Sequence, residues 1–183
     1  MLKIKNFHKA YKSADVCVDA VHSDARVVLL VGANGSGKST LLKALAGLID
    51  YQGVLEMKGS IMYAEELIRY PDYLTPEKYL NYLIKLGTAS TIRMQWLIDA
   101  FDLNEHVQKP FKALSKGTKQ KVHLVQAMME SRDVYLLDEP LSGLDVYAQR
   151  QLANIIKKRC EKFVIATHET NIFDGLECHK VQL

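Results

Sequence analysis

A glycine-rich segment near the start of the chain has the residue types and spacing that phosphate binding requires. Gly32, Gly37, Lys38 and Ser39 fit the pattern G-x-x-x-x-G-K-[ST]. Glycines let backbone N–H groups approach phosphate oxygens, and a helix that begins here would present its N-terminal N–H groups to the same anion. A lysine at this spacing reaches the β- and γ-phosphates, and the serine hydroxyl can contact Mg²⁺. An ordinary glycine turn fits less well, because an apolar β-forming run precedes the segment and a helical pattern follows it.

Acidic and imidazole side chains follow two further apolar runs. Asp138 and Glu139 end the run at 134–138, and His168 follows the run at 163–167. In a protein with a phosphate-binding loop, a strand-end aspartate holds Mg²⁺, and Glu139 is placed to orient the water that attacks the γ-phosphate. His168 could reach the γ-phosphate. The alternatives are an acidic turn and an incidental histidine, but the other strand ends already carry phosphate chemistry.

A second segment has the features of an anion site at a helix N-terminus. Residues 114–120, Leu-Ser-Lys-Gly-Thr-Lys-Gln, combine a serine N-cap, a glycine and the start of a helix. One copy of the chain has no need of two such sites. In a face-to-face dimer, however, each copy can contribute this helix N-terminus to the nucleotide held by the other. An ordinary capped helix is the alternative.

The elements that must position these side chains alternate between strands and helices. We expect strands at 2–8, 16–21, 26–31, 134–138 and 163–167, and a hairpin at 53–63 about Lys58-Gly59. The first helix is expected directly after the phosphate loop and carries Leu41, Leu42, Leu45 and Leu48. Further helices are expected from Thr75 and at about 90–101, 115–130 and 146–159. Continuous apolar strands separated by helices predict a parallel sheet covered on both faces. Ligands of such sheets bind beyond the carboxyl ends of the strands, which is where the candidate residues lie.

The aromatic residues of the middle segment divide into two groups. We expect Trp96 to pack in the core, because it lies at helical spacing with other apolar residues. Core packing and a binding surface stay equally open for Tyr70, Tyr73, Tyr79 and Tyr82.

Composition places the chain in the ordinary globular class. It has 183 residues, of which 48% are hydrophobic and 25% charged, with a formal net charge of +3. This mild charge gives no reason to expect a nucleic-acid partner. The three cysteines form no C-x-x-C pair, which favours a reduced, cytosolic setting. We expect neither a signal peptide nor a membrane span, since the start lacks an apolar core and no run of 18 apolar residues occurs.

Together these motifs resemble the ATP-binding subunit of a bacterial ABC transporter over nearly the full chain and in the same order. Residues 32–40 resemble the Walker A loop, 114–120 the LSGGQ signature, 134–140 Walker B with its catalytic glutamate, and 142–145 the D-loop, while His168 resembles the switch histidine. The resemblance implies an α/β P-loop fold of ABC type, with a parallel core sheet flanked by helices, a small antiparallel β portion and a helical subdomain. It implies one domain, 1–183, with the core at about 1–66 and 114–183 and the helical subdomain at about 67–113.

The same resemblance implies the site residues. The residues expected to contact the nucleotide are Tyr11, Gly32, Asn34, Gly35, Ser36, Gly37, Lys38, Ser39, Thr40, Ser115, Gly117 and Asp145. Catalytic roles are implied for Lys38, Glu139 and His168. Mg²⁺ ligation is implied for Ser39, Asp138 and Glu66. Tyr11 would stack on adenine. Three positions depart from the family pattern. The signature has Lys116 and Thr118, as in exporter-type subunits whose membrane partner is encoded separately, and Glu66 replaces the Q-loop glutamine, which adds repulsion near a triphosphate.

The expected function is ATP hydrolysis, with ATP and Mg²⁺ bound in a sandwich dimer of this chain with itself or a related ATPase. The dimer would drive a separate integral-membrane permease from the cytoplasmic side, peripheral at the inner face of the cell membrane. One rival is a soluble ABC ATPase of DNA repair, translation or cluster assembly, which would predict coiled-coil insertions, a second cassette or a basic groove. Another is a binding module without hydrolysis, which Glu66 and Thr118 favour and which Glu139 and His168 disfavour.

Overall fold

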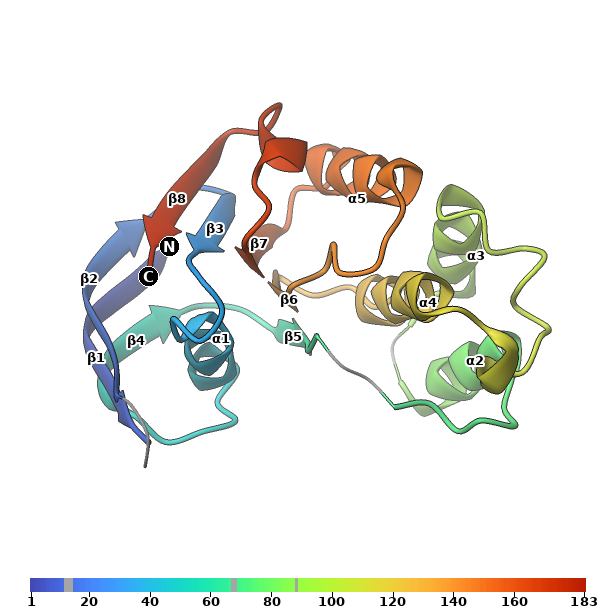
Figure 1. Ribbon diagram of the computed structural model, residues 1–183, viewed down its shortest axis with the longest axis horizontal. Coiled ribbons are helices and arrows are strands. Elements are labelled where there is room, and N and C mark those ends of the chain that lie inside the picture. Colours follow the sequence, from blue (N-terminus) through green and yellow to red (C-terminus); the bar gives the residue numbers. More distant parts are fainter. Residues whose placement is uncertain (12–14, 67–68, 88) are drawn as a thin grey trace. The chain divides into compact units, whose positions relative to one another are not determined.

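The structure is a computed structural model that describes residues 1–11, 15–66, 69–87 and 89–183 (Figure 1). They form two compact units, one of residues 1–65, 132–140 and 157–183 and the other of residues 66–131 and 141–156. The expected helical block at 67–113 is therefore part of a larger second unit, and residues 67 and 68, where it was expected to begin, lie outside the described residues.

A parallel sheet carries the predicted strand ends in the first unit. Its order is β5-β6-β7-β3-β8, with β5 at Ile61–Ala64, β6 at Val134–Asp138, β7 at Lys162–Thr167, β3 at Val27–Val31 and β8 at Cys178–Gln182. Every neighbouring pair in it is parallel. The three central strands are the apolar runs that the sequence predicts. The edge strand β8 was not predicted, because only Val181 is buried in it and it lacks an apolar run.

A smaller antiparallel sheet completes the strands of this unit. Its order is β2-β1-β4, with β2 at Asp15–Ser23, β1 at Leu2–Ala10 and β4 at Gln52–Met57. The expected hairpin at 53–63 is wrong, because β4 pairs with β1 whereas β5 pairs with β6 in the other sheet. The reason lies in the turn. Gly59 has φ 109°, and the Asp133 carboxylate accepts hydrogen bonds from the backbone N–H and hydroxyl of Ser60 at 2.7 and 2.8 Å, which directs the chain towards β6.

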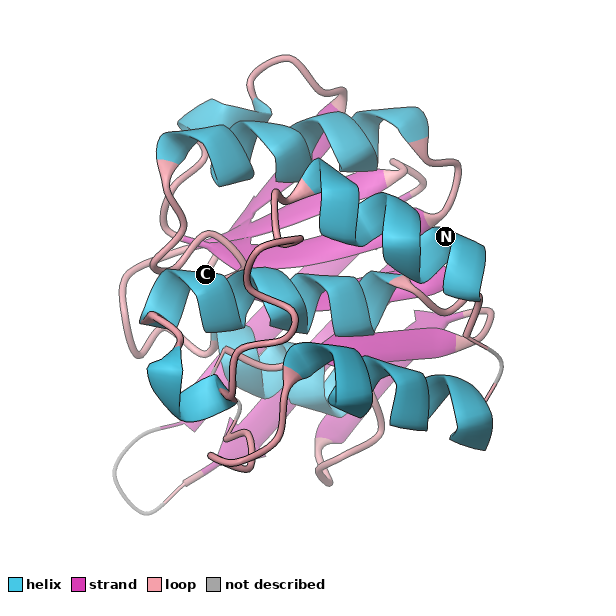
Figure 2. Cartoon of the chain, turned by 90° about the vertical axis from the view of Figure 1, so that its right-hand side faces the viewer, coloured by secondary structure: helices cyan, strands magenta, loops and turns pink. Residues whose placement is uncertain are grey.

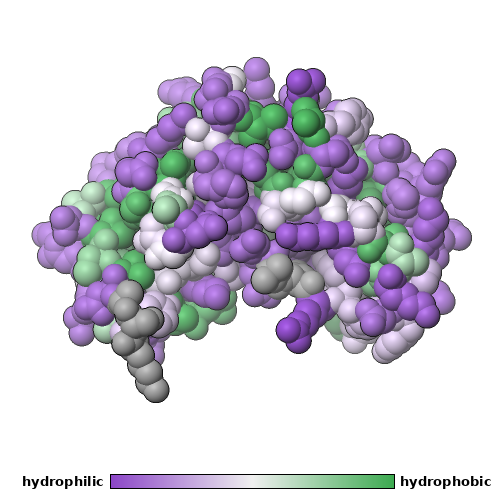
Figure 3. Space-filling view, in the orientation of Figure 1, coloured by the Kyte–Doolittle hydropathy of each residue, from purple (hydrophilic) through white to green (hydrophobic). Residues whose placement is uncertain are grey.

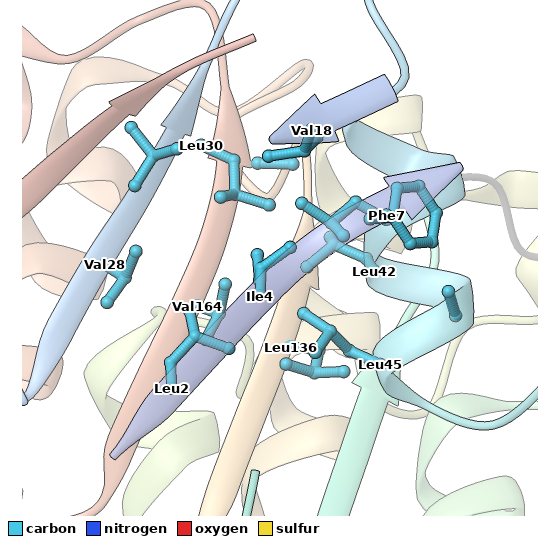
Figure 4. Close-up of a cluster of buried hydrophobic side chains, with 14 of the residues drawn as sticks. Leu2, Ile4, Phe7, Val18, Val28, Leu30, Leu42, Leu45, Leu136 and Val164 are labelled. Atoms are coloured by element: carbon cyan, nitrogen blue, oxygen red, sulfur yellow. The ribbon is translucent and has the colours of Figure 1, made fainter. Parts of the chain in front are cut away.

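One hydrophobic core holds the strands of both sheets and helix α1, Lys38–Leu45, together (Figure 4). Leu2 and Ile4 from β1, Val28 and Leu30 from β3, Leu42 and Leu45 from α1, Leu136 from β6 and Val164 from β7 contribute to it. Leu48 does not share this face, because α1 ends before Gly47 at φ 71° and Leu48 is 61% exposed. The core fixes the N-terminal end of α1 against the carboxyl ends of the central strands.

The second unit is helical. It contains α2 at Pro76–Leu86, α3 at Thr91–Ala100, the 3₁₀ turn η1 at Phe111–Ala113, α4 at Lys116–Met128 and most of α5 at Val146–Lys158, and α3 lies beside α4 (Figures 1 and 2). The predicted helix starts are confirmed, and each has a side-chain N-cap. Thr75, Ser90 and Ser115 accept hydrogen bonds from the third backbone N–H after them, which starts α2, α3 and α4 where the sequence places them.

The aromatic residues of this unit do not all behave as expected. The prediction that Trp96 packs in the core is wrong, because its side chain is 47% exposed while the neighbouring Leu97 occupies the buried face of α3. The tyrosines divide. Tyr70 stacks on Phe111 at 4.1 Å between ring centroids, and Tyr79 lies edge-on to both rings. Tyr73 and Tyr82 are exposed.

The surface agrees with the composition. The face drawn in Figure 3 is largely hydrophilic, and its hydrophobic residues form small separate areas. Among the helices that the structure describes, none is both long and apolar enough to cross a membrane. The remaining 3₁₀ turn, η2 at Asn171–Phe173, buries Phe173 before β8.

Candidate nucleotide site

The predicted phosphate loop connects the carboxyl end of β3 to the N-terminus of α1. Gly35 and Gly37 have φ of 85° and 98°, a backbone conformation that favours glycine. A Cβ at Gly32 would lie 2.5 Å from the Ser36 hydroxyl oxygen, and a Cβ at Gly37 would overlap Val16 of β2. Glycine is thus required here by backbone conformation and by close approach together.

Two polar side chains of this loop fit an anion. Lys38 is 6% exposed, and its ammonium group donates to the carbonyl oxygens of Gly32 at 2.8 Å and Ala33 at 3.1 Å. These contacts hold the amine over the loop that would enclose a phosphate. The hydroxyl oxygen of Ser36 is buried and has no hydrogen-bond partner among the described residues. A buried hydroxyl without a partner is a costly feature that a bound phosphate oxygen would relieve.

Asp138 and Ser39 form the part of the site that suits a hard cation. Asp138 ends β6 and is 4% exposed, and its Oδ1 accepts a hydrogen bond of 3.0 Å from the Ser39 hydroxyl. Carboxylate and hydroxyl oxygens are the donors that Mg²⁺ prefers. These two side chains therefore fit the ion that the sequence predicts, and they come from β6 and α1, which the core packs together.

Glu139 lies directly beside them in an uncommon backbone conformation. Its φ of 43° is left-handed, and its backbone N–H donates to the carbonyl oxygen of Ala166 at 2.9 Å. This turn brings the carboxylate back over the phosphate loop. Its Oε1 lies 3.5 Å from the Lys38 ammonium nitrogen, and its Oε2 lies 2.9 Å from Nδ1 of His168. The structure thus brings together the three residues for which the sequence predicts catalytic roles.

Tyr63 is a neighbour of the site that the sequence reasoning missed. Its hydroxyl donates to Oδ2 of Asp138 at 3.3 Å. Burial, assisted by the negative charge of Asp138, raises the pKa of Tyr63 well above its usual value, so the phenol keeps its proton. The contact depends on the register of β5 against β6, which aligns Tyr63 with Leu136 and could not be deduced from the sequence.

Tyr11 and Thr40 lie at the outer end of the phosphate loop. Their hydroxyl oxygens are 3.3 Å apart, and the Tyr11 ring is 47% exposed with the Lys9 ammonium 5.9 Å from its centroid. The ring is thus exposed beside the loop, and its stacking on adenine stays a prediction. Asn34 is also exposed.

The signature and D-loop residues belong to the second unit and contact one another there. The Ser115 hydroxyl accepts from the backbone N–H of Thr118 at 3.1 Å, and the Lys116 ammonium donates to the Ser142 hydroxyl at 3.3 Å. A Cβ at Gly117 would overlap the carbonyl oxygen of Gly143. The N-terminal end of α4 and the segment at 141–145 therefore pack closely within this unit.

Asp145 and Glu66 complete the predicted set. Asp145 forms an ion pair of 2.9 Å with Lys121 and accepts from the backbone N–H of Ala148 at 2.8 Å. The hydrogen bond from Lys121 is the main cause that holds the pKa of Asp145 below its usual range, and the hydrogen bond from the backbone N–H of Ala148 is the second. Glu66 is exposed and begins the second unit.

A parallel sheet with a glycine-rich loop, a buried lysine and a strand-end aspartate defines a P-loop nucleoside triphosphatase. The family model described as ABC transporter matches residues 20–142, and the chain belongs to this family of ATPases.

The relatives agree. An uncharacterized ABC transporter ATP-binding protein of Methanocaldococcus jannaschii is 30% identical over 194 residues, covering 98% of this chain and 72% of that protein. The cytochrome c biogenesis ATP-binding export protein CcmA of Novosphingobium aromaticivorans is 31% identical over 147 residues, covering 78% of this chain and 74% of that protein. A solved structure of RNase-L inhibitor has 25% sequence identity at a TM-score of 0.78, covering 95% of this chain. This chain spans 35% of that one.

Proposed function

We propose that this chain hydrolyses ATP to ADP and phosphate as the ATP-binding subunit of an ABC transporter whose permease is a separate protein. The observation that carries the proposal is the convergence of Lys38, Ser39, Asp138, Glu139 and His168 at the carboxyl ends of β3, β6 and β7. These side chains supply a cation, two hard oxygen donors, a carboxylate and an imidazole around one phosphate loop. This is the set of groups that phosphoryl transfer to water requires.

In the proposed reaction the chain acts mainly by positioning and by charge. Backbone N–H groups of the loop and the Lys38 ammonium group bind the phosphate oxygens, and Glu139 orients the attacking water. His168 donates a hydrogen bond either to Glu139, as in this structure, or to the γ-phosphate. Bound Mg²⁺, held by Ser39 and Asp138, would neutralise part of the phosphate charge. Glu66 is proposed to add a carboxylate near this ion.

Two copies of the chain, or this chain and a related ATPase, are proposed to close on two nucleotides. Each copy contributes the α4 N-terminus, with Ser115 and Gly117, to the nucleotide on the other copy's phosphate loop. The support within this chain is that Ser115 already caps α4 and that the Gly143 backbone packs against Gly117, where a side chain would not fit. Asp145 would contact the opposite loop.

Closure of this dimer is proposed to drive the membrane permease, docked near Glu66 and the helical segment at 67–113. In this arrangement the chain works at the cytoplasmic, inner face of the cell membrane. The Lys116 and Thr118 replacements in the signature and the likeness to CcmA, whose name describes an export protein, favour an exporter-type system.

A second candidate is an ATPase that acts on a soluble partner. The observation in its favour is the likeness to RNase-L inhibitor, which covers nearly all of this chain. Affinity capture from detergent-solubilised membranes separates the two functions. Recovery of an integral-membrane protein supports the transporter, and recovery of soluble partners alone supports the second candidate.

Light scattering tests the ATPase cycle directly, with wild type and Glu139→Gln measured with and without ATP and Mg²⁺. A dimer that forms with ATP and persists only in Glu139→Gln supports the sandwich and the role of Glu139 together. A monomer in every condition, with ATP bound, contradicts self-association and requires a different ATPase partner. A chain that binds no ATP contradicts the proposed function.

A further inference from the structure

The Asp138 carboxylate is held by donors from two different elements. The Ser39 hydroxyl, in the first turn of α1, donates to Oδ1 at 3.0 Å, and the Tyr63 hydroxyl, from β5, donates to Oδ2 at 3.3 Å. Asp138 is 4% exposed, so these contacts replace most of the hydration that a carboxylate has in water. The plane of the carboxylate is therefore fixed from both of its oxygens.

The two donors have different relations to a cation at this site. Ser39 has one hydroxyl group, and its oxygen is the atom that a hard cation would use. If this oxygen held a cation, the direction of its proton, and with it the bond to Oδ1, would depend on where the cation lies. Tyr63 approaches the other oxygen, and a cation on the Oδ1 side has no need to displace it. Terminal torsions of aspartate are soft, so a donor bound to Oδ2 contributes to where Oδ1 points.

We propose that Tyr63 is a positioning residue for Asp138, which holds Oδ1 towards Ser39 and the Mg²⁺ position through its hydrogen bond to Oδ2. This inference rests on the proposed ATPase function for the identity of the ion. Hydrogen bonds to the ligands of a metal orient those ligands, and their loss weakens metal affinity by about 10- to 100-fold. For a single neutral donor at 3.3 Å we expect the lower end of this range.

Packing is the other role that Tyr63 has in the structure. Its ring lies against the hydrophobic core of the first unit and is half-buried. Tyr63→Phe keeps the ring and removes only the hydroxyl, so it separates positioning from packing. Tyr82→Phe is the matched control, because Tyr82 is 59% exposed on α2 and the same atom is removed.

The first measurement is the affinity for a fluorescent ATP analogue, in EDTA and in Mg²⁺, for wild type and both variants. In wild type, binding that Mg²⁺ strengthens is expected. In Tyr63→Phe the affinity in EDTA stays within twofold of wild type, while the Mg²⁺-dependent gain falls about tenfold. Tyr82→Phe behaves as wild type. An unchanged Mg²⁺-dependent gain in Tyr63→Phe overturns the inference, whereas wild type that binds no nucleotide overturns the proposed function instead.

The second measurement uses the chain without metal or nucleotide. Urea unfolding of wild type, Tyr63→Phe, Asp138→Asn and the double variant gives a double-mutant cycle. Coupling between the two residues is expected, because Tyr63 has lost its charged acceptor in Asp138→Asn. Additive effects within the error of the measurement overturn the inference. A Tyr63→Phe chain that fails to fold also overturns it, since the hydroxyl would then serve the fold as a whole.

Discussion

Replacement of Glu139 by glutamine removes one negative charge from the centre of the site and keeps the shape of the side chain. The Lys38 ammonium nitrogen lies 3.5 Å from Oε1, and both side chains are largely buried. At an effective dielectric constant of 20, the Coulomb attraction at this separation is about 5 kcal/mol. The desolvation of both ions offsets much of it, and Lys38 keeps its two carbonyl acceptors. We therefore expect the nucleotide-free protein to lose about 2 kcal/mol of unfolding free energy.

The effect on the reaction is expected to be larger and specific. Loss of a group that orients and deprotonates water slows hydrolysis by about 10²- to 10⁴-fold. ATP affinity is not expected to fall, because the carboxylate repels the γ-phosphate. Phosphate release at saturating ATP, binding of an ATP analogue and urea unfolding measure the three quantities. Glu169→Gln is the control, since the same change is made at an exposed carboxylate 3.6 Å from the other side of His168.

Two results would refute this reasoning. Hydrolysis by Glu139→Gln within tenfold of wild type would show that another group orients the water. Equal losses of activity in Glu139→Gln and Glu169→Gln would show that the rate of hydrolysis depends on negative charge near His168 in general and not on the buried carboxylate of Glu139.

Three further predictions concern single positions. Gly37→Ala places a Cβ against Val16 of β2 at φ 98°, so we expect the free energy of unfolding to fall by several kcal/mol, or the chain not to fold, and no nucleotide binding in any folded fraction. The control is Gly175→Ala, whose Cβ meets no atom within 4 Å and should leave the melting temperature unchanged. Ser115→Ala removes the cap of α4 and should cost about 1 kcal/mol in urea unfolding while weakening ATP-dependent dimer formation; dimer formation equal to wild type would contradict the role of this helix end. The pKa of Asp145 is lowered chiefly by Lys121, so the contribution of this pair to stability is present above the unfolded pKa of about 3.9 and is lost as pH falls through the lower folded pKa. The difference in unfolding free energy between wild type and Asp145→Asn should therefore shrink from pH 7 to pH 3. A constant difference would contradict the pairing.

The sequence predicts the elements whose signal is local. The phosphate loop is defined by glycines at fixed spacing, the buried strands by unbroken apolar runs, and the helix starts by Thr75, Ser90 and Ser115. In each case the residues that cause the structure are neighbours in the chain, so their spacing is enough to predict it.

Features that depend on distant partners could not be predicted in the same way. The turn at Gly59 suggests a hairpin until Asp133, more than 70 residues away, binds Ser60. Helical spacing places Trp96 with apolar residues, but Leu97 points to the core. Tyr63 reaches Asp138 only because of the register of β5 against β6. Each of these outcomes is decided by tertiary contacts that one sequence does not display.

The left-handed backbone at Glu139 has a consequence for attempts to make this protein more stable. A φ of 43° disfavours glutamate by about 1 kcal/mol or more relative to glycine. Glu139→Gly would relax this strain, but it would also remove the carboxylate that pairs with the Lys38 ammonium group and with His168. Because the loss of that pairing is expected to exceed the strain that is relieved, glycine should lower the net stability. The common stabilising replacement of a left-handed residue by glycine therefore does not apply at this position, and stability has to be raised elsewhere in the chain.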